Sequence, residues 1–496
     1  MRYLVFTALA LVLLVGASSA LPNQVTQTIV ATATGGDVDQ GAENYVYEAG
    51  GEGTIVTQTI DMTADATGYV YQDANNDAEY VYGDGAVVTQ SLSMDASGED
   101  VYQNLWWGWG NYVDLYGVGT TATQNIWQVA DAEGYAGQYG WNEALQNSGM
   151  ITQGIGQAAV AGGDIDQYAY NDAYSYGDNS AVVQDVSMDA NAGGYADQDG
   201  DNYADMWSFD TIMVDQSATL NAIAGDWVEQ YFENTNWYAG TNTWSAQDIT
   251  MSGTGDDVYQ YLYNYFASDG AVSEATQVLN AGANSEGYAY QDAYNEMLTF
   301  GDDILGQSIY LNAVAADDAI QYGWNDAYVY GDNLNLGQLS WISGDAGYVY
   351  QDAWNYAEFM DAVTVAQDIA FTAISDDVGV DQYGYNEATN YPLGLTGGES
   401  TNLIGQSISA AATGGDVSYQ YLDNYADTYW NWDPSTYTVT QNNVATLAAN
   451  DYADQEMFNW VDWWEYNTGS VAMNINGDAS ADYVYQYHEN WVEVYS

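Results

Sequence analysis

A glutamine followed four residues later by an asparagine recurs along almost the whole chain. The pattern Gln-x-x-x-Asn runs from Gln40 and Asn44 to Gln486 and Asn490, and most of its steps are 29 to 32 residues long. Gln103 belongs to the same series, but an insertion at 106–110 displaces its asparagine. Internal repeats of this period are typical of solenoids, in which each repeat packs only against its neighbours.

A second series of single glutamines lies between the members of the first. Gln58, Gln90, Gln184 and Gln307 belong to it, and Met473 takes the place of glutamine in the last repeat. Each repeat therefore holds two segments. We call them the first-series segment, which carries Gln-x-x-x-Asn, and the second-series segment, which carries the other glutamine.

Both segments alternate in polarity with a period of two. In the second-series segment 56–64 the even positions are Val, Gln, Ile, Met and Ala, and the odd positions are Thr and Asp. In the first-series segment 321–330 one face holds Gln, Gly, Asn, Ala and Val, and the other holds Tyr, Trp and Asp. Such alternation is the signature of a β-strand with one buried face. Gly-Asp turns, such as that at 83–85, separate the segments.

These patterns predict an all-β fold. We expect a β-solenoid of stacked β-arches with two strands per coil, about 15 coils of ~31 residues, and two facing parallel sheets. Residues 21–496 are expected to form a single repeat domain.

The amides are expected to form ladders inside the solenoid. A buried amide destabilises the fold unless its hydrogen bonds are met, and identical stacking lets each amide bond its equivalent one coil away. A one-residue slip would expose every amide at once, so the ladders also fix the register. The alternative is that the amides lie in ordinary turns. The predicted ladder residues include Gln72, Asn76, Gln291, Asn295, Gln321, Asn325, Gln351, Asn355, Gln58, Gln90, Gln184 and Gln307.

The first 20 residues are typical of an export signal. Arg2 supplies the positive start, residues 4–15 the apolar stretch and 18–20 a small-residue cleavage site. The apolar stretch is short for a membrane span, so we expect no membrane insertion. The mature chain is expected outside the cell, at the cell surface.

The charge is strongly one-sided, with 70 acidic residues against one Lys or Arg, which is Arg2. Such a surface cannot neutralise phosphates, which excludes nucleic acid as a partner. It attracts divalent cations, so calcium or magnesium is the candidate bound ion. Stacked acids such as Glu296 and Asp326 repel by roughly 1 kcal/mol per pair in water, and turn aspartates Asp302 and Asp332 are the candidate ligands. The alternative is a diffuse cation atmosphere, and no cofactor is otherwise indicated.

Nothing in the sequence favours catalysis. There is no cysteine and a single histidine, His488, and no phosphate-binding loop with a lysine. Paired carboxylates can hydrolyse glycosides, but here the acids are spread evenly over the repeats. We therefore expect no enzymatic activity.

A repeated strand-turn-strand unit with glutamine and asparagine at fixed spacing resembles the curlin repeats of bacterial amyloid fibres. Segments 138–144 and 382–388 carry this likeness. The repeat here is longer, the gap from Gln to Asn is shorter, and the chain is richer in tyrosine and acids. With an exported chain that lacks Lys and Arg, it is more similar to the amyloid-type sheath proteins of filamentous methanogens. That resemblance implies a tube or hoop that encloses the cell, built from β-stacked subunits.

The chain is expected to polymerise. It opens on a second-series segment at 25–33 and closes on a first-series segment, with no evident capping element, so one molecule can continue the rhythm of another head to tail. The predicted outer aromatic ladder of Tyr294, Trp324, Trp354 and Tyr385 serves either lateral packing of molecules or stacking within one molecule. Longer loops at 106–112, 391–401 and 429–437 are expected to bulge outward. The alternative function is a secreted adhesin or carbohydrate-binding protein that uses the exposed aromatics.

Overall fold

The computed structural model describes most of the chain. It covers residues 6–12, 24–104, 110–208, 211–239, 243–270, 272–301, 304–332, 334–361, 363–390, 401–428, 436–464 and 467–495. The predicted outward loops fall largely on 105–109, 391–400 and 429–435, which lie outside the described residues. Within the described part of the chain, no helix has the length and apolarity that crossing a bilayer requires.

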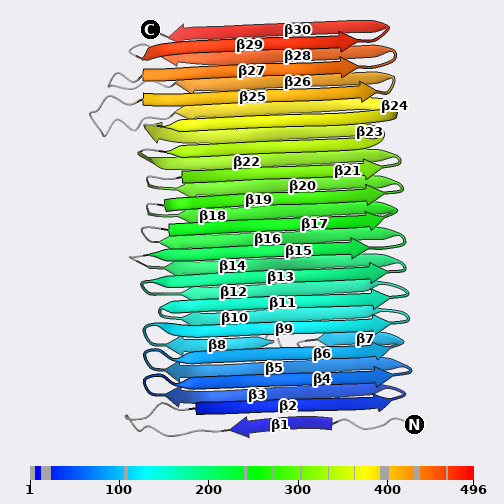
Figure 1. Ribbon diagram of the computed structural model, residues 1–496, viewed down its shortest axis with the longest axis vertical. Helices are drawn as coiled ribbons and strands as arrows, with labels where there is room; N and C mark the ends of the chain where they lie inside the picture. The colour runs from blue at the N-terminus through cyan, green and yellow to red at the C-terminus, as the bar shows by residue number, and fades with distance from the viewer. Residues whose placement is uncertain are drawn as a thin grey trace. The chain divides into compact units, whose positions relative to one another are not determined.

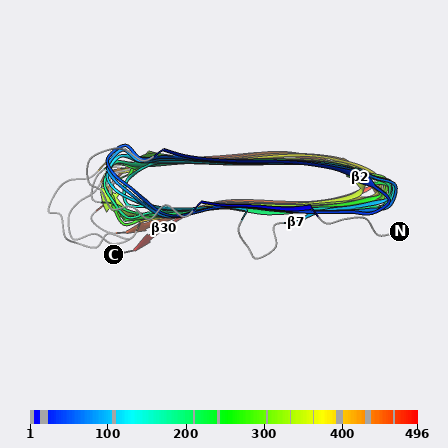
Figure 2. The ribbon, with the colours of Figure 1, turned by 90° about the horizontal axis from the view of Figure 1, so that it is seen from below.

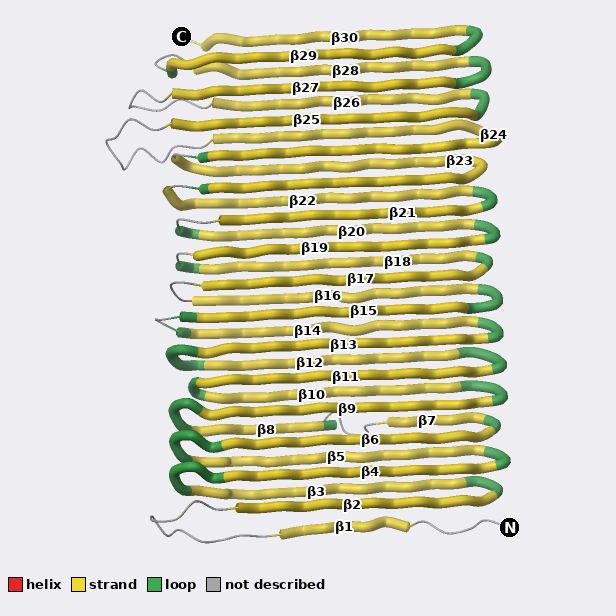
Figure 3. Tube along the Cα trace, viewed as in Figure 1, coloured by secondary structure: helices red, strands yellow, loops and turns green. Residues whose placement is uncertain are grey.

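The chain divides into two compact units, Met1–Thr241 with Ala246–Gly255, and Asn242–Ser245 with Asp256–Ser496. Both consist of strands and short turns in the described residues (Figure 3). That they form a single domain stays a prediction. The strands of the first unit are β1 (Phe6–Val12), β2 (Gln24–Gly35), β3 (Val38–Gly50), β4 (Ile55–Ala66), β5 (Tyr69–Tyr82), β6 (Val87–Gly98), β7 (Asp100–Asn104), β8 (Asn111–Tyr116), β9 (Thr120–Ala132), β10 (Ala136–Gln146), β11 (Gly149–Ala161), β12 (Ile165–Ser175), β13 (Ser180–Ala192), β14 (Tyr195–Trp207), β15 (Ile212–Ile223), β16 (Trp227–Ala239) and most of β17 (Thr243–Gly255).

The second unit repeats the same alternation of segments. Two of its strands, β23 and β24, run without interruption through a second-series and a first-series segment. Its strands are β18 (Asp257–Ser268), β19 (Val272–Ser285), β20 (Tyr288–Thr299), β21 (Ile304–Ala315), β22 (Asp318–Asp332), β23 (Asn335–Asp361), β24 (Thr364–Asn390), β25 (Thr401–Gly414), β26 (Val417–Thr428), β27 (Thr436–Ala448), β28 (Tyr452–Trp464), β29 (Thr468–Ser480) and β30 (Tyr483–Tyr495).

Each unit is a parallel β-solenoid, as the sequence predicts. Strands pair with the equivalent strand one repeat away, so that β10 pairs with β12 and β12 with β14, and the intervening β11 pairs with β13 (Figure 1). The equivalent residues are in register, for example Gln138, Gln167 and Gln198. First-series and second-series segments form two facing sheets, which the uninterrupted strands β23 and β24 join into one, and each coil is a flattened loop in cross-section (Figure 2). The chain makes about 14 turns of ~31 residues.

The alternating pattern decides which side chains are buried. Gln58, Ile60 and Met62 on β4 are fully buried, whereas Asp61 and Thr63 on the opposite face are exposed. On β22 the odd positions from Gln321 to Val329 face the core, and the even positions are half-buried or exposed. The core therefore lies between the sheets and contains amides and small or aliphatic groups.

The turns stack as closely as the strands do. Gly83 has a φ of +130°, and a Cβ at this position would lie 2.1 Å from the carbonyl oxygen of Gly51 in the previous coil. Only glycine fits such a contact, because its backbone tolerates positive φ and it carries no side chain. The close approach of successive coils thus explains why glycine recurs at turns along this chain.

The insertion at 106–110 leaves the solenoid intact. The first-series segment there is divided into β7 and β8, which pair with β10 through Gln103 and Asn111 respectively. Asn111 is therefore the displaced asparagine of this repeat.

Candidate functional site

Three amide ladders run through the core of each unit. In the first-series sheet, the side-chain amide of Gln321 donates to Gln291 at 2.8 Å, and that of Gln351 donates to Gln321 at 2.9 Å. The asparagines form a parallel ladder, with Asn295 donating to Asn325 at 2.9 Å and Asn325 to Asn355 at 2.8 Å.

The third ladder belongs to the second-series sheet. Gln90 donates to Gln58 at 2.8 Å in the first unit, and Gln338 donates to Gln307 at 2.8 Å in the second. The structure places the residues expected in the ladders on these rows, each no more than 1% exposed: Gln72, Asn76, Gln291, Asn295, Gln321, Asn325, Gln351, Asn355, Gln58, Gln90, Gln184 and Gln307. None of them lies in a turn.

The amides also tie the two sheets together across the core. The Nε2 of Gln58 donates to the main-chain oxygens of Asn44 at 3.1 Å and Asp77 at 2.8 Å, which belong to β3 and β5. In the opposite direction, Asn44 donates to the main-chain oxygen of Thr59 at 3.1 Å. Each amide thereby satisfies more than one hydrogen bond, which offsets the free-energy cost of burying it.

The glutamine and asparagine ladders have opposite polarity. Each glutamine donates to the glutamine of the preceding coil, as Gln486 does to Gln455 at 2.9 Å. Each asparagine donates to the asparagine of the following coil, as Asn459 does to Asn490 at 2.8 Å. The last coil therefore presents the carbonyl of Gln486 and the amide of Asn490, and the opposite end of these two ladders presents the complementary groups. The second-series ladder ends earlier, because Met473 carries no amide.

Sequence reasoning missed several members of the buried polar network. Gln157 donates to Gln128 at 2.7 Å and extends a short fourth ladder over two coils. Asn443 accepts from Asn424 at 2.8 Å. Each of the two glutamines lies four residues after a ladder glutamine, on the same face of its strand, and this spacing was the available signal.

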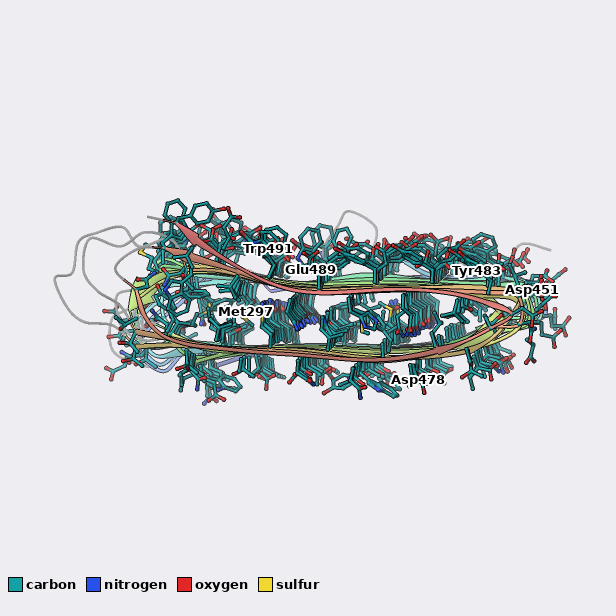
Figure 4. The ribbon with its side chains drawn as sticks, turned by 90° about the horizontal axis from the view of Figure 1, so that it is seen from above. Met297, Asp451, Asp478, Tyr483, Glu489 and Trp491 are labelled. Carbon is teal, nitrogen blue, oxygen red and sulfur yellow. The ribbon has the colours of Figure 1, made fainter. Side chains whose placement is uncertain are left out.

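The last described coil is open on one side. Among the described residues, β30 pairs only with β28. Val484 and Val492, which face inward, are 38% and 45% exposed, whereas their equivalents one coil earlier, Ala453 and Val461, are fully buried. Figure 4 shows this end, with Tyr483, Glu489 and Trp491 on the outer face of one sheet, Asp478 on the outer face of the other and Met297 between the sheets. The exposure reflects the missing neighbour and not a change in the sequence pattern.

The first coil carries an unsatisfied acceptor. The Oδ1 atom of Asn44 is buried and has no hydrogen-bond partner in the structure. At this position β3 pairs with β1, which places Ala10 beside Asn44. Alanine has no side-chain amide that could donate to Asn44. Strand β1 lies within the predicted export signal.

The four residues of the expected aromatic ladder are in register on the outer face of the first-series sheet. Tyr294, Trp324, Trp354 and Tyr385 occupy equivalent positions on neighbouring strands. Tyr294 contacts Trp324 edge to face at 6.2 Å between ring centroids, and Trp354 contacts Tyr385 at 5.8 Å. Trp324 and Trp354 nevertheless remain 42% and 40% exposed. Ring contacts within the molecule therefore occur, in edge-to-face and tilted geometry, and lateral packing stays a prediction.

Tyrosine hydroxyls donate to several of the acids on this face. The Tyr294 hydroxyl donates to Asp326 at 2.7 Å, and that of Tyr263 donates to Glu296 at 3.1 Å. Glu296 and Asp326 themselves occupy adjacent register positions, as expected. The same bond joins Tyr135 to Asp166 at 2.6 Å in the first unit. A phenol donor one coil away thus offsets part of the repulsion between stacked acids.

The side chains of the expected metal ligands, Asp302 and Asp332, are not placed by the structure. Asp302 lies outside the described residues, and so does the side chain of Asp332, whose backbone ends β22. No group of three or more acidic or histidine side chains is arranged to hold a metal ion in the described part of the chain. Binding of calcium or magnesium stays a prediction.

Burial among aromatic rings raises the pKa of several carboxyls on the first-series face. Desolvation, reinforced by Glu233, raises the pKa of Asp201 to about 8, and desolvation raises the pKa of Glu143 to about 7. One carboxylate oxygen of Asp201 is buried with no hydrogen-bond partner. Ionisation of all the acids on this face therefore lowers the stability of the folded state.

The Met473 interruption predicts a stabilising substitution. Met473 aligns with Gln441, whose buried Oε1 has no hydrogen-bond partner. Met473→Gln restores the missing donor and should raise the free energy of unfolding by about 1 kcal/mol, measured by urea denaturation. Met473→Leu, which adds no donor, is the control. A glutamine variant no more stable than the leucine variant would contradict the ladder energetics.

The raised pKa of Asp201 predicts a pH-dependent stability difference. An aspartate whose folded-state pKa exceeds the unfolded value of about 3.9 binds its proton more tightly when folded. Ionised Asp201 therefore destabilises the folded state. This destabilisation is absent below about pH 4 and complete above about pH 8, the folded-state pKa. Asp201→Asn should therefore be more stable than wild type at pH 9 by about 1 kcal/mol or more. The advantage should shrink toward pH 4, as measured by urea midpoints across this range.

The exposed Asp478 supplies the control for this series, because Asp478→Asn removes an acid without relieving burial. An equal gain from both substitutions at pH 9 would show that general charge reduction, and not the environment of Asp201, is responsible.

Comparison with models of known families, with curated proteins and with solved structures finds no match. The resemblance to curlin repeats and to methanogen sheath proteins therefore stays a prediction. Functional interpretation rests on the ladder polarity, the open last coil and the aromatic, acidic outer face.

Proposed function

We propose that this protein is the structural subunit of an extracellular cross-β polymer, a sheath, tube or fibre that encloses or coats the cell. The observation that carries the proposal is the complementarity of the two ends of the amide ladders. Molecules join head to tail, with β30 of one molecule alongside β3 of the next. Such a contact is heterologous, so it propagates into a filament or closes into a ring.

The complementary groups are specific. At the open last coil, Gln486 directs its carbonyl and Asn490 its amide along the stack, because each already bonds the preceding coil through its other atom. At the first coil, Gln40 accepts from Gln72 and Asn44 donates to Asn76. In the joint, Gln40 donates to Gln486, and Asn490 donates to the orphaned Oδ1 of Asn44. Both ladders then continue with unchanged polarity.

Removal of the export signal frees the first coil for this contact. Strand β1 pairs with β3 over Gln40–Val46, the edge that the joint requires. Cleavage after residue 20 removes all of β1. Assembly is thereby tied to export, since the mature chain alone presents both edges.

The outer face supports lateral contacts between polymers. It combines half-exposed aromatics with a formal net charge of −69 for the whole chain. Such polymers repel each other at low ionic strength, and divalent cations relieve that repulsion. A secreted adhesin that stacks sugars on Trp324 and Trp354 is the alternative, and it requires a molecule that stays dispersed.

A proline on the open edge of β30 tests the joint. The N–H of Tyr483 donates to Asp451 of the preceding coil at 2.8 Å. Backbone groups alternate sides along a strand, so the N–H of His488, five residues on, faces the open edge. His488→Pro therefore removes a hydrogen bond between molecules and none to β28.

We expect the mature chain to sediment as filaments or tubes and His488→Pro to remain dispersed, with at least a tenfold higher soluble concentration at equilibrium, equivalent to about 1.4 kcal/mol. Circular dichroism checks that the variant keeps its β structure. His488→Ala, which keeps the N–H, should assemble like wild type. Assembly of the proline variant to the wild-type extent, or a wild-type protein dispersed under all conditions, would refute the head-to-tail joint.

A further inference from the structure

A small hollow opens on the outer face of the first-series sheet in the second unit. It has a volume of about 280 Å³ and is lined by Trp324, Asp326, Tyr328, Trp354 and Tyr356. Its origin lies in the alternating pattern, because Asp326 is a short side chain between two large aromatics on the same face of β22. The neighbouring β23 places Trp354 beside Trp324 and Tyr356 beside Asp326.

The two tryptophans that line the hollow pack against aromatic rings of neighbouring strands. Trp324 rests against Tyr294 at 6.2 Å between ring centroids, and Trp354 rests against Tyr385 at 5.8 Å. Tyr328 and Tyr356 contact each other at 5.5 Å. The rings are thus largely fixed before any ligand arrives, which reduces the entropy lost on binding.

The hollow is also electronegative. The carboxylate of Asp326 lies in it and is oriented by the Tyr294 hydroxyl at 2.7 Å. Glu296 is its neighbour in register on one side, and Glu358 accepts from Tyr356 at 3.1 Å on the other. The only Lys or Arg of the chain is Arg2, so the mature chain has no such cation of its own to place there.

We propose that this aromatic hollow binds a small organic ammonium ion. The faces of the tryptophan and tyrosine rings attract a positive charge, and aromatic walls are the usual surroundings of quaternary ammonium groups. Asp326 supplies the counter-charge. A metal ion fits less well, because calcium takes six to eight oxygen ligands and the hollow offers one carboxylate among rings. This binding goes beyond the structural function. It does not depend on the head-to-tail joint, which leaves the outer face free, whereas lateral contacts between polymers would cover the hollow.

The test measures equilibrium binding of radiolabelled choline to the mature chain as dispersed molecules or single filaments, in which the outer face is free. The buffer contains 1 M sodium chloride, at which the Debye length is about 3 Å, so that the diffuse cation atmosphere contributes little. The neutral isostere 3,3-dimethylbutan-1-ol serves as competitor, since it has the same shape as choline without the charge. We expect saturable binding that a large excess of the alcohol does not displace.

Two variants and two matched controls locate the site. Trp354→Ala and Asp326→Asn should each weaken choline binding at least tenfold. Trp341→Ala removes a tryptophan that is 42% exposed on the second-series sheet, away from the hollow. Asp292→Asn removes a half-buried acid from the first-series sheet, which carries the hollow, but outside its lining. Neither control should change the affinity by more than twofold.

Absence of saturable binding in 1 M salt would overturn the proposal. So would equal competition by the neutral alcohol, or equal losses in the controls and the site variants. The comparison of choline with its isostere uses wild-type protein, so it decides the question even if a substitution impairs folding.

Discussion

The buried amide ladder is the interaction on which the rest of this structure depends. An amide in a protein core is costly unless its donors and acceptors are all engaged, and here the partner of each amide is the same residue one coil away. Every repeat must therefore place glutamine and asparagine at the same height and on the same face. Because a single slip would leave whole rows unsatisfied, the ladders enforce the in-register parallel stacking seen in both units.

This dependence on the neighbouring coil makes the ends of a stack incomplete. The inward-facing Val484 and Val492 are exposed at the last coil, and the Oδ1 of Asn44 is orphaned at the first. Because glutamines donate backward and asparagines forward, the two ends are complementary and not identical. A polymer built by parallel stacking in this way has a direction.

The outer face follows a different principle from the core. There the repeat does not stack identical groups throughout, because like charges at every coil would repel. Tyrosine hydroxyls donate to several of the acids, as that of Tyr294 does to Asp326. The free-energy cost of burying an ionised acid is evident at Asp201, where desolvation raises the pKa to about 8. It is also this mixture of large rings and short acids that leaves the hollow around Asp326.

The fold was largely predictable, because a period of ~31 residues and strict alternation leave few architectures other than a two-stranded solenoid. The ladder rows followed from the same spacing. The polarity of the ladders did not, because sequence does not say which way a buried amide points. The position of Asn111 was obscured by an insertion. Gln128 and Gln157 were not predicted, because glutamine occupies their position in these two adjacent repeats and does not recur along the chain. The hollow at Asp326 was not predictable either, because it depends on how Trp324 and Trp354 are held by their neighbours.

In the proposed polymer the two first-series amide ladders continue from one molecule to the next. Electron cryo-microscopy of assemblies of the mature chain, lacking residues 1–20, tests this continuity directly. We expect an unbroken spacing of about 4.8 Å across the joint, with Gln486 beside Gln40 and Asn490 beside Asn44 of the following molecule. A joint in another register, an antiparallel joint between like ends, or dispersed single molecules in every condition would contradict it.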